Sequence, residues 1–378
     1  MSSGIVGRSL PRKEGREKVE GAARYIDDMR LPGMIYGTTV RSHVPRGRID
    51  AITFGEGVPW DEITVVTAAD IPGSNVVKLL TDDQPFLADG VVNHINEPVV
   101  LLAHSNRSVL EAARGLVTLE ITPLEPLCDM VSAFNGPSIT RGADNIQKKI
   151  TIHKGDVDAV FEAAQAEGLI IVEGAYETGA QEQLYIEPQG MLATADRNSV
   201  TVRGSLQCPY YVHKALTPLF GLPADRVRVI QAATGGGFGG KEEYPSIIAG
   251  HAALLAYHSG RPVKLIYDRA EDMGATTKRH PSITTHRTAV TPEGRIVAMS
   301  IDFMIDGGAY VTLSPVVLSR GVIHASGPYV CDHVRVMGHS VATNSVPYGA
   351  FRGFGAPQSC FAVERHMDRL HGGRGSRR

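Results

Sequence analysis

The sequence predicts a mixed protein of the α+β class, and three observations support this prediction. First, residues 226–260 contain a strand pattern, a glycine-rich turn and a helix pattern, in that order. Second, the continuous apolar run 98–103 is followed by an amphipathic helix pattern at 108–114. Third, two strand patterns, 283–290 and 295–305, flank a turn that contains proline and glycine, as in an antiparallel hairpin.

The composition is that of a globular protein large enough for two or three domains. The chain has 378 residues, of which 43% are hydrophobic and 21% charged. Its net charge of −2 provides no global field that would recruit nucleic acid or an anionic membrane. No apolar run approaches the roughly 20 residues of a membrane span, and Met1 to Gly7 contain no export signal. We therefore expect a cytoplasmic protein that binds neither nucleic acid nor membranes.

The cysteines do not form a metal-binding pattern. Cys128, Cys208, Cys331 and Cys360 lie far apart, and no C-x-x-C motif is present. An iron–sulfur or zinc site built by this chain alone is therefore not expected, and no residue is predicted to ligate a metal.

Residues 15–127 are expected to form a first domain. Its further strand patterns are 34–40, 63–67 and 116–121. The run 98–103 shows no polar alternation, so we expect this strand to be buried on both faces. Residues 128–154 have poor periodicity and are expected to be a linker.

A second domain is expected over residues 155–370. It begins with a helix pattern at 156–167 and a strand pattern at 169–173. The dense polar stretch 181–189 follows, and polar groups there need partners if they are buried. This stretch is either a second wall of a binding site or a hydrogen-bonded structural crossing.

The segment 235–242 has five glycines in its first six positions, which no packed core requires. It joins a strand at 226–232 to a helix that opens at Pro245 and closes at Gly260. Bare amides and a helix N-terminus would then face one space, which suits an anion such as phosphate.

Two other interpretations of this loop stay open. Gly235, Gly237 and Gly240 satisfy G-x-G-x-x-G, and Asp268 ends the next strand pattern, so a nicotinamide or flavin dinucleotide fold is possible. Against it, Asp268 lies beyond the expected spacing of roughly 20 residues, and Phe238 places a large ring in the turn. The third interpretation is a surface turn without a ligand.

Three further features could reach a ligand. Gln207 stands between a strand end and a helix start, and Arg320 lies in an apolar run, where an arginine is either paired or aimed at a ligand. Residues 350–358 repeat Gly-Phe-Gly, and Arg352 offers a planar donor fork for an oxyanion. Two glycine loops with phenylalanines indicate two jaws around one flat, phosphate-bearing ligand.

At these residues the sequence resembles the molybdenum hydroxylases, the xanthine dehydrogenase and aldehyde oxidase family. The resemblance runs from about Gly15 almost to the chain end. It implies an α/β hammerhead domain over 15–127 and the first, incomplete part of a mixed α/β molybdopterin-binding domain over 155–370. The implied cofactor is molybdenum held by a molybdopterin dithiolene, in the plain or the cytosine dinucleotide form, which needs few or no protein ligands.

The resemblance assigns roles residue by residue. Gln207 matches a glutamine that hydrogen-bonds a molybdenum oxygen, and Arg352 matches an arginine near that oxygen. The loop that lies against the molybdopterin is matched by Gly236, Gly237, Phe238 and Gly239.

Glu242, Arg320 and Phe354 match substrate-pocket residues of the purine hydroxylases. Phe354 would stack on a heteroaromatic ring, Arg320 would stabilise negative charge that develops on the substrate, and Glu242 would hold the ring by hydrogen bonds. The resemblance therefore favours a purine or related N-heterocycle over a plain aldehyde.

The family also implies partners and a missing part. Iron–sulfur clusters and FAD are expected on partner subunits. The family's glutamate base belongs to a second molybdenum-binding half, whereas residues 371–378 look like a disordered basic tail. We expect a truncated large subunit without turnover on its own, with a separate C-terminal half as a further partner. An aldehyde-oxidising member and an inactive remnant are the alternatives.

Overall fold

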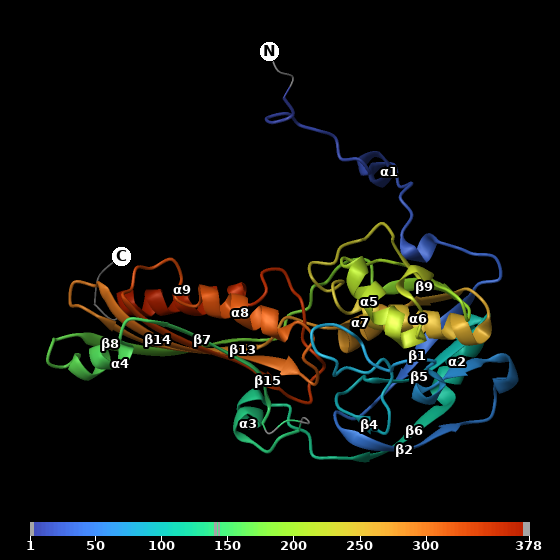
Figure 1. Ribbon diagram of the computed structural model, residues 1–378, viewed down its shortest axis with the longest axis horizontal. Helices are drawn as coiled ribbons and strands as arrows, with labels where there is room; N and C mark the ends of the chain where they lie inside the picture. Colours follow the sequence, from blue (N-terminus) through green and yellow to red (C-terminus); the bar gives the residue numbers. More distant parts are fainter. Residues whose placement is uncertain (1–3, 140–141, 143, 373–378) are drawn as a thin grey trace.

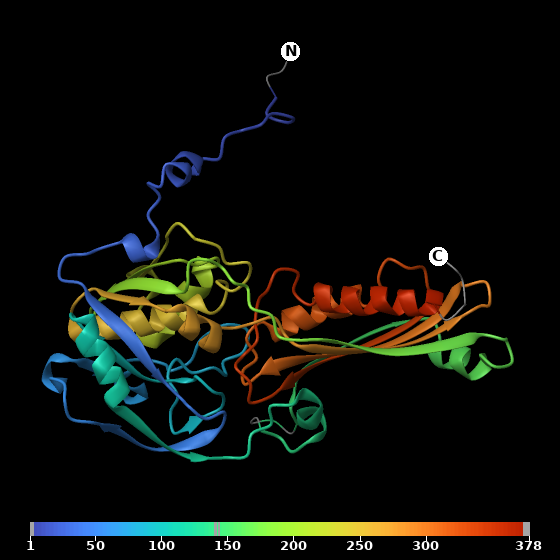
Figure 2. The same cartoon turned by 180° about the vertical axis from the view of Figure 1, so that it is seen from behind.

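The computed structural model describes residues 4–139, 142 and 144–372. Its body has two lobes that lie side by side (Figure 1). One lobe is built on a seven-stranded sheet and a three-stranded sheet, and the other on a five-stranded sheet. The N-terminal segment with the short helix α1 (Gly15–Val19) extends away from both lobes (Figures 1 and 2).

As far as the chain is described, the first lobe combines two sheets with four helices and four short 3₁₀ turns. The strand order of the large sheet is β11 (Val227–Gln231), β10 (Val200–Gly204), β9 (Gly190–Ala195), β12 (Val263–Ile266), β1 (Ile35–Arg41), β5 (Pro98–His104) and β3 (Thr64–Val66). The small sheet contains β4 (Val91–Val92), β2 (Gly47–Phe54) and β6 (Val117–Pro123). The helices are α2 (Arg107–Leu116), α5 (Pro209–Phe220), α6 (Pro245–Ser259) and α7 (Arg269–Ala275), and the 3₁₀ turns are Ile26–Asp28, Trp60–Glu62, Ala68–Asp70 and Ala224–Arg226.

The large sheet takes strands from both predicted domains. β1 pairs in parallel with β12, with Ile35 opposite Val263. The division into domains at 15–127 and 155–370 therefore does not coincide with a break in this sheet, and it stays a proposal about the chain.

The most apolar segments of the first lobe lie in its hydrophobic core. Every residue of β5 is buried, as its continuous apolar run predicts. Leu101 faces the core around α6, while Val100 and Leu102 face the core under α2. The helix α6 is buried along most of its length, so its N-terminus does not open to solvent as an anion site.

The second lobe is a five-stranded sheet with the two longest of its helices on one face and a short helix, Met130–Asn135, on the other (Figure 2). Its strand order is β7 (Ile146–Lys154), β15 (His333–Ala342), β14 (Ile296–Gly308), β13 (Ser282–Val290) and β8 (Ile170–Thr178). Its helices are α3 (Met130–Asn135), α4 (Val157–Ala163), α8 (Ser314–His324) and α9 (Ala356–Gly372). β13 and β14 form the predicted antiparallel hairpin.

Two predictions about irregular segments are wrong in part. Residues 128–154 are not a plain linker, because they contain α3 and because β7 pairs with β15 along its length. Residues 371 and 372 belong to α9, because burial of His366 and Leu370 holds this helix to its end. The rest of the predicted tail lies outside the described residues.

Among the helices of the described ranges, none has both the length and the apolar character that crossing a membrane requires.

Candidate functional site

The two glycine loops meet at the junction of the lobes. We call residues 235–241 the first glycine loop and residues 350–355 the second. The N–H of Arg352 donates to the carbonyl oxygen of Phe238 at 2.9 Å. Gly239 has φ +104, and a Cβ atom there would lie 2.7 Å from the carbonyl oxygen of Ala350. The loops therefore touch through backbone atoms, and glycine at 239 permits the contact.

Buried side chains form hydrogen bonds with the second loop next to this contact. The Gln183 Nε2 donates to the carbonyl oxygen of Ala350 at 2.8 Å, and the Ala350 N–H donates to Glu243 Oε1 at 3.0 Å. The backbone of Ala350 is thus held at both its N–H and its C=O group. Burial raises the pKa of Glu243 to about 7.

Arg279 supports the second loop from another direction. Its Nε donates to Gln181 Oε1 at 2.9 Å, and its Nη2 donates to the carbonyl oxygen of Arg352 at 3.1 Å. The guanidinium carbon lies 3.9 Å from the ring centroid of Phe351. A planar, delocalised cation suits both the hydrogen bonds and the stacking.

Gln207 lies against the first loop, as its place in the sequence predicts. Its Oε1 accepts hydrogen bonds from the N–H groups of Gly239 at 2.9 Å and Lys241 at 3.3 Å. A Cβ atom at Gly237 would lie only 2.4 Å from this oxygen. Its Nε2 has no partner within the described residues, so this donor is available to a ligand.

The first loop uses some of its amides and leaves others open. The N–H groups of Gly235 and Gly239 donate to side-chain oxygens. Those of Gly236, Gly237 and Phe238 find no acceptor in the part of the chain that the structure describes. Phe238 is 49% exposed as a residue, and its φ of 51° is left-handed.

The three predicted pocket residues also come together. The Arg320 guanidinium carbon, on α8, lies 4.8 Å from the ring centroid of Phe354. Burial raises the pKa of Glu242, and the positive charge of Arg320 opposes this rise. Glu242 and Arg320 are thus close enough to interact, although one follows the first loop and the other lies beside the second.

The polar stretch 181–189 is a structural crossing beside the first loop. Its side chains alternate, with the polar face turned inward and the apolar face outward. The buried members are Gln183, Tyr185 and Gln189, whereas Leu184 is 62% and Ile186 91% exposed. Gln189 Nε2 donates to the carbonyl oxygen of Gly240 at 2.7 Å.

The sequence did not single out several residues that shape the site. They are Gln183, Glu187, Gln189, Lys241, Glu243 and Arg279. A signal existed for the first three, because polar residues at every second position of 183–189 indicate one inward face.

The structure does not support the dinucleotide interpretation. The first glycine loop follows β11, an edge strand that, among the described residues, pairs only with β10. β11 and β12 are separated by two other strands, so α6 does not join neighbouring parallel strands. The Asp268 carboxylate accepts from the Glu271 N–H and caps α7.

The residues present fit a flat ligand that carries phosphate. The exposed ring of Phe238 offers a stacking face. The three open amides and the Gln207 Nε2 offer donors in the same loop region. The Arg352 guanidinium has no partner within the described residues and suits an anion.

Two models of known protein families match this chain. The molybdopterin cofactor-binding domain matches residues 140–371, and the a/b hammerhead domain of aldehyde oxidase and xanthine dehydrogenase matches residues 20–125.

Relatives match over nearly the whole chain. The nicotinate dehydrogenase large molybdopterin subunit of Eubacterium barkeri is 34% identical over 97% of this chain and 85% of its own. A probable xanthine dehydrogenase subunit of Bacillus subtilis is 35% identical over 96% of this chain and 48% of its own.

Among solved structures, the aldehyde oxidoreductase from Desulfovibrio desulfuricans matches with a TM-score of 0.88 and 26% identity. The match covers 99% of this chain and 43% of that one. Several relatives are thus about twice as long as the aligned chain. The fold, the paired glycine loops and these matches show that the chain belongs to the aldehyde oxidase and xanthine dehydrogenase family, as a molybdopterin-binding part.

Proposed function

We propose that this chain provides cofactor- and substrate-binding residues of a molybdenum hydroxylase that oxidises a purine or another N-heterocycle with water as the oxygen donor. The observation that carries the proposal is the grouping of Glu242, Arg320 and Phe354 beside the paired glycine loops. The bound cofactor, in its plain or dinucleotide form, would supply the two-electron oxidation.

The chain's own residues would hold the cofactor from one side. The amides of Gly236, Gly237 and Phe238 and the Gln207 Nε2 are the open donors of the first loop. Arg352 would bring a positive charge to the cofactor from the second loop. None of these groups needs to ligate the metal, which the molybdopterin would hold.

The substrate residues suit a nitrogen heterocycle. The Phe354 ring would stack on a flat ring, and Arg320 would stabilise negative charge that develops on it. The Glu242 carboxyl group would hold ring N–H groups by accepting hydrogen bonds. Relatives named for nicotinate and xanthine are 34% and 35% identical to this chain.

The whole enzyme would be an assembly. We propose iron–sulfur and FAD subunits as the electron path, in the cytoplasm. We also propose a second chain that completes the site. In support, this chain spans 85% of one relative that is itself named a subunit, but only 48% of another. We propose that turnover needs this assembly and that the isolated chain has none.

The test is turnover by the assembled enzyme, with a purine, nicotinate and an aromatic aldehyde as substrates. Arg320→Ala should lower turnover of the N-heterocycle by about 2–4 kcal/mol of transition-state stabilisation, as for other oxyanion donors. Unchanged turnover would remove the N-heterocycle assignment, and preferential oxidation of the aldehyde would support the aldehyde alternative. An assembly without molybdenum and pterin would contradict the proposed function itself.

A further inference from the structure

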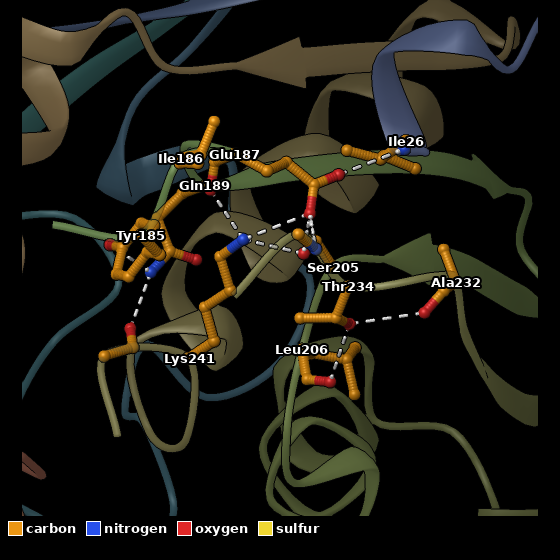
Figure 3. A network of polar contacts seen from close by, with 12 residues as sticks. Ile26, Tyr185, Ile186, Glu187, Gln189, Ser205, Leu206, Ala232, Thr234 and Lys241 are labelled. Carbon is orange, nitrogen blue, oxygen red and sulfur yellow. Dashed lines mark hydrogen bonds and ion pairs between the residues drawn. The ribbon is translucent and has the colours of Figure 1, made fainter. Parts of the chain in front are cut away.

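A buried ion pair lies directly behind the first glycine loop. The Lys241 side chain is 0% exposed and that of Glu187 14%, and Lys241 Nζ lies 3.2 Å from Glu187 Oε2. Nζ also donates to the Glu187 carbonyl oxygen at 2.6 Å and to Ser205 Oγ at 2.8 Å (Figure 3). The ammonium group, which has three protons, thus has three acceptors.

The lysine points backward from the loop. A lysine after a glycine turn often reaches forward to a phosphate as a point charge. Lys241 instead reaches the carboxylate of Glu187 inside the protein (Figure 3). Its full burial excludes direct contact with a ligand in this conformation, so its role is internal.

One carboxylate oxygen connects the two ends of the loop. Glu187 Oε2 accepts from the Gly235 N–H at 2.7 Å and from Lys241 Nζ at 3.2 Å. The same oxygen accepts from Ser205 Oγ at 2.6 Å, and Oε1 accepts from the Ile26 N–H at 3.3 Å. The first and last residues of the loop are therefore bonded to the same oxygen atom.

The open amides lie between these two ends. Gly236, Gly237 and Phe238 have N–H groups without acceptors in the described residues, and their direction depends on how the loop is closed. A flexible glycine-rich loop would lose this arrangement readily because glycine restricts the backbone least. Charge-assisted hydrogen bonds at the two ends of the loop can restrict its backbone, which the glycines themselves do not.

The burial of this pair is costly, which favours a positioning role over simple stabilisation. Taking two charges out of water cancels much of their attraction, so a buried pair is weak evidence for stability. Desolvation lowers the pKa of Lys241, and the Glu187 carboxylate opposes that shift. The pair instead fixes the positions of four separate chain segments relative to one another.

We propose that Glu187, with Lys241 as its counterion, is a positioning residue that closes the first glycine loop and so presents the amides of Gly236, Gly237 and Phe238 to the cofactor. The identity of the ligand rests on the proposed function. The closure of the loop does not, and it can be tested on the chain without cofactor.

The first experiment measures amide hydrogen exchange of the loop in the full chain. Glu187→Ala should accelerate exchange of the Gly239, Gly240 and Lys241 amides at least about tenfold, because the loop opens locally. These amides donate to the Gln207 side chain and to the Gly237 carbonyl oxygen, so they are protected without direct contact with Glu187. Glu187→Gln keeps an oxygen for Gly235 and Ser205 and should restore most of the protection. Exchange in Glu187→Ala within about twofold of the unmodified chain would overturn the proposal.

The matched control is the ion pair between Arg41 and Glu271. Its side chains are 9% and 14% exposed, similar to the buried pair behind the loop, and it joins β1 to α7. Glu271→Ala should leave exchange of the first loop unchanged. Equal acceleration in both variants would assign the effect to general destabilisation and overturn the proposal. If Glu187→Ala does not fold, Lys241→Met tests the same closure with the same two outcomes.

The second experiment measures molybdenum and pterin content of the assembled enzyme after gel filtration. Glu187→Ala should retain at least about tenfold less cofactor than Glu271→Ala, since binding groups that are not preorganised bind more weakly. Equal retention would overturn the link between closure and cofactor. An unmodified assembly without any pterin would instead contradict the proposed function, while the exchange experiment would still judge the closure.

Discussion

The backbone N–H of Arg352 donates a 2.9 Å hydrogen bond to the carbonyl oxygen of Phe238, which joins two glycine loops far apart in the chain. Both loops use the same local device. Phe238 and Phe354 have left-handed φ values of 51° and 47°, and each precedes a glycine of positive φ. Residues other than glycine are uncommon at such φ values, so both phenylalanines adopt an unfavourable backbone conformation.

Gly239→Ala should break this junction. The new methyl group would lie 2.7 Å from the Ala350 carbonyl oxygen, at φ +104, so we expect a loss of at least about 2 kcal/mol in the free energy of unfolding. Gly260→Ala is the control, because Gly260 has φ +64 and nothing within 4 Å; strain alone should cost about 1 kcal/mol there. Chemical denaturation measures both values, and equal losses would contradict the close approach of the loops.

Arg320→Ala should raise the pKa of Glu242. Burial already raises this pKa, and the charge of Arg320 holds it down, so removal of the cation leaves the burial effect unopposed. Carboxyl NMR titration of the isolated chain measures the change without any cofactor. Arg352→Ala is the control, since this second arginine has no such effect on Glu242; an identical shift in both variants would show a non-specific field.

Local patterns predicted part of the elements and the two loops, and the reasons are physical. The run 98–103 is apolar at every position, which only a doubly buried strand such as β5 needs. The glycines of 235–240 cannot fill a core, so local composition is enough to predict a loop there.

Local patterns did not predict which strands pair with one another. Nothing near Ile35 or Val263 indicates that their strands are neighbours, because strand periodicity specifies a face and not a partner. The strand β7 was missed because it lies at the sheet edge and its lysines interrupt the alternation. The buried ion pair of Lys241 was missed because a lysine is almost never fully buried unless paired.

Arg279→Lys should weaken the second loop. A lysine cannot keep both the bond to Gln181 and the bond to the Arg352 carbonyl while it stacks on Phe351. We expect a loss of about 1.5–3 kcal/mol in the free energy of unfolding, typical of a charged hydrogen bond.

The control for this variant is Arg261→Lys. Arg261 is exposed and donates to the Gly33 carbonyl oxygen from Nε, so the change should stay within about 0.5 kcal/mol. Urea denaturation of both variants measures the difference. Similar small losses would mean that the planar guanidinium of Arg279 is not required.

Glu243→Gln should remove a pH dependence of stability that the buried carboxyl imposes. Burial raises the pKa of Glu243 from 4.5 to about 7, so the folded chain binds more protons than the unfolded chain between these values. The stability that this group contributes is complete below the unfolded pKa and is lost as pH rises through the folded pKa. Glutamine is neutral and can still accept from the Ala350 N–H. Relative to the unmodified chain, the variant should therefore gain about 1 kcal/mol between about pH 6 and about pH 8.

Asp306→Asn provides the comparison that isolates this effect. Burial raises the pKa of Asp306 only to about 6. Most of the stability that Asp306→Asn gains over the unmodified chain should therefore already be present at that pH. Denaturation curves at several pH values measure both differences. If the gain of Glu243→Gln is flat above about pH 6 or reverses, Glu243 is ionised in the folded chain, and its bond to Ala350 is a bond to a carboxylate. The loop junction would then strengthen, and not weaken, as the pH rises.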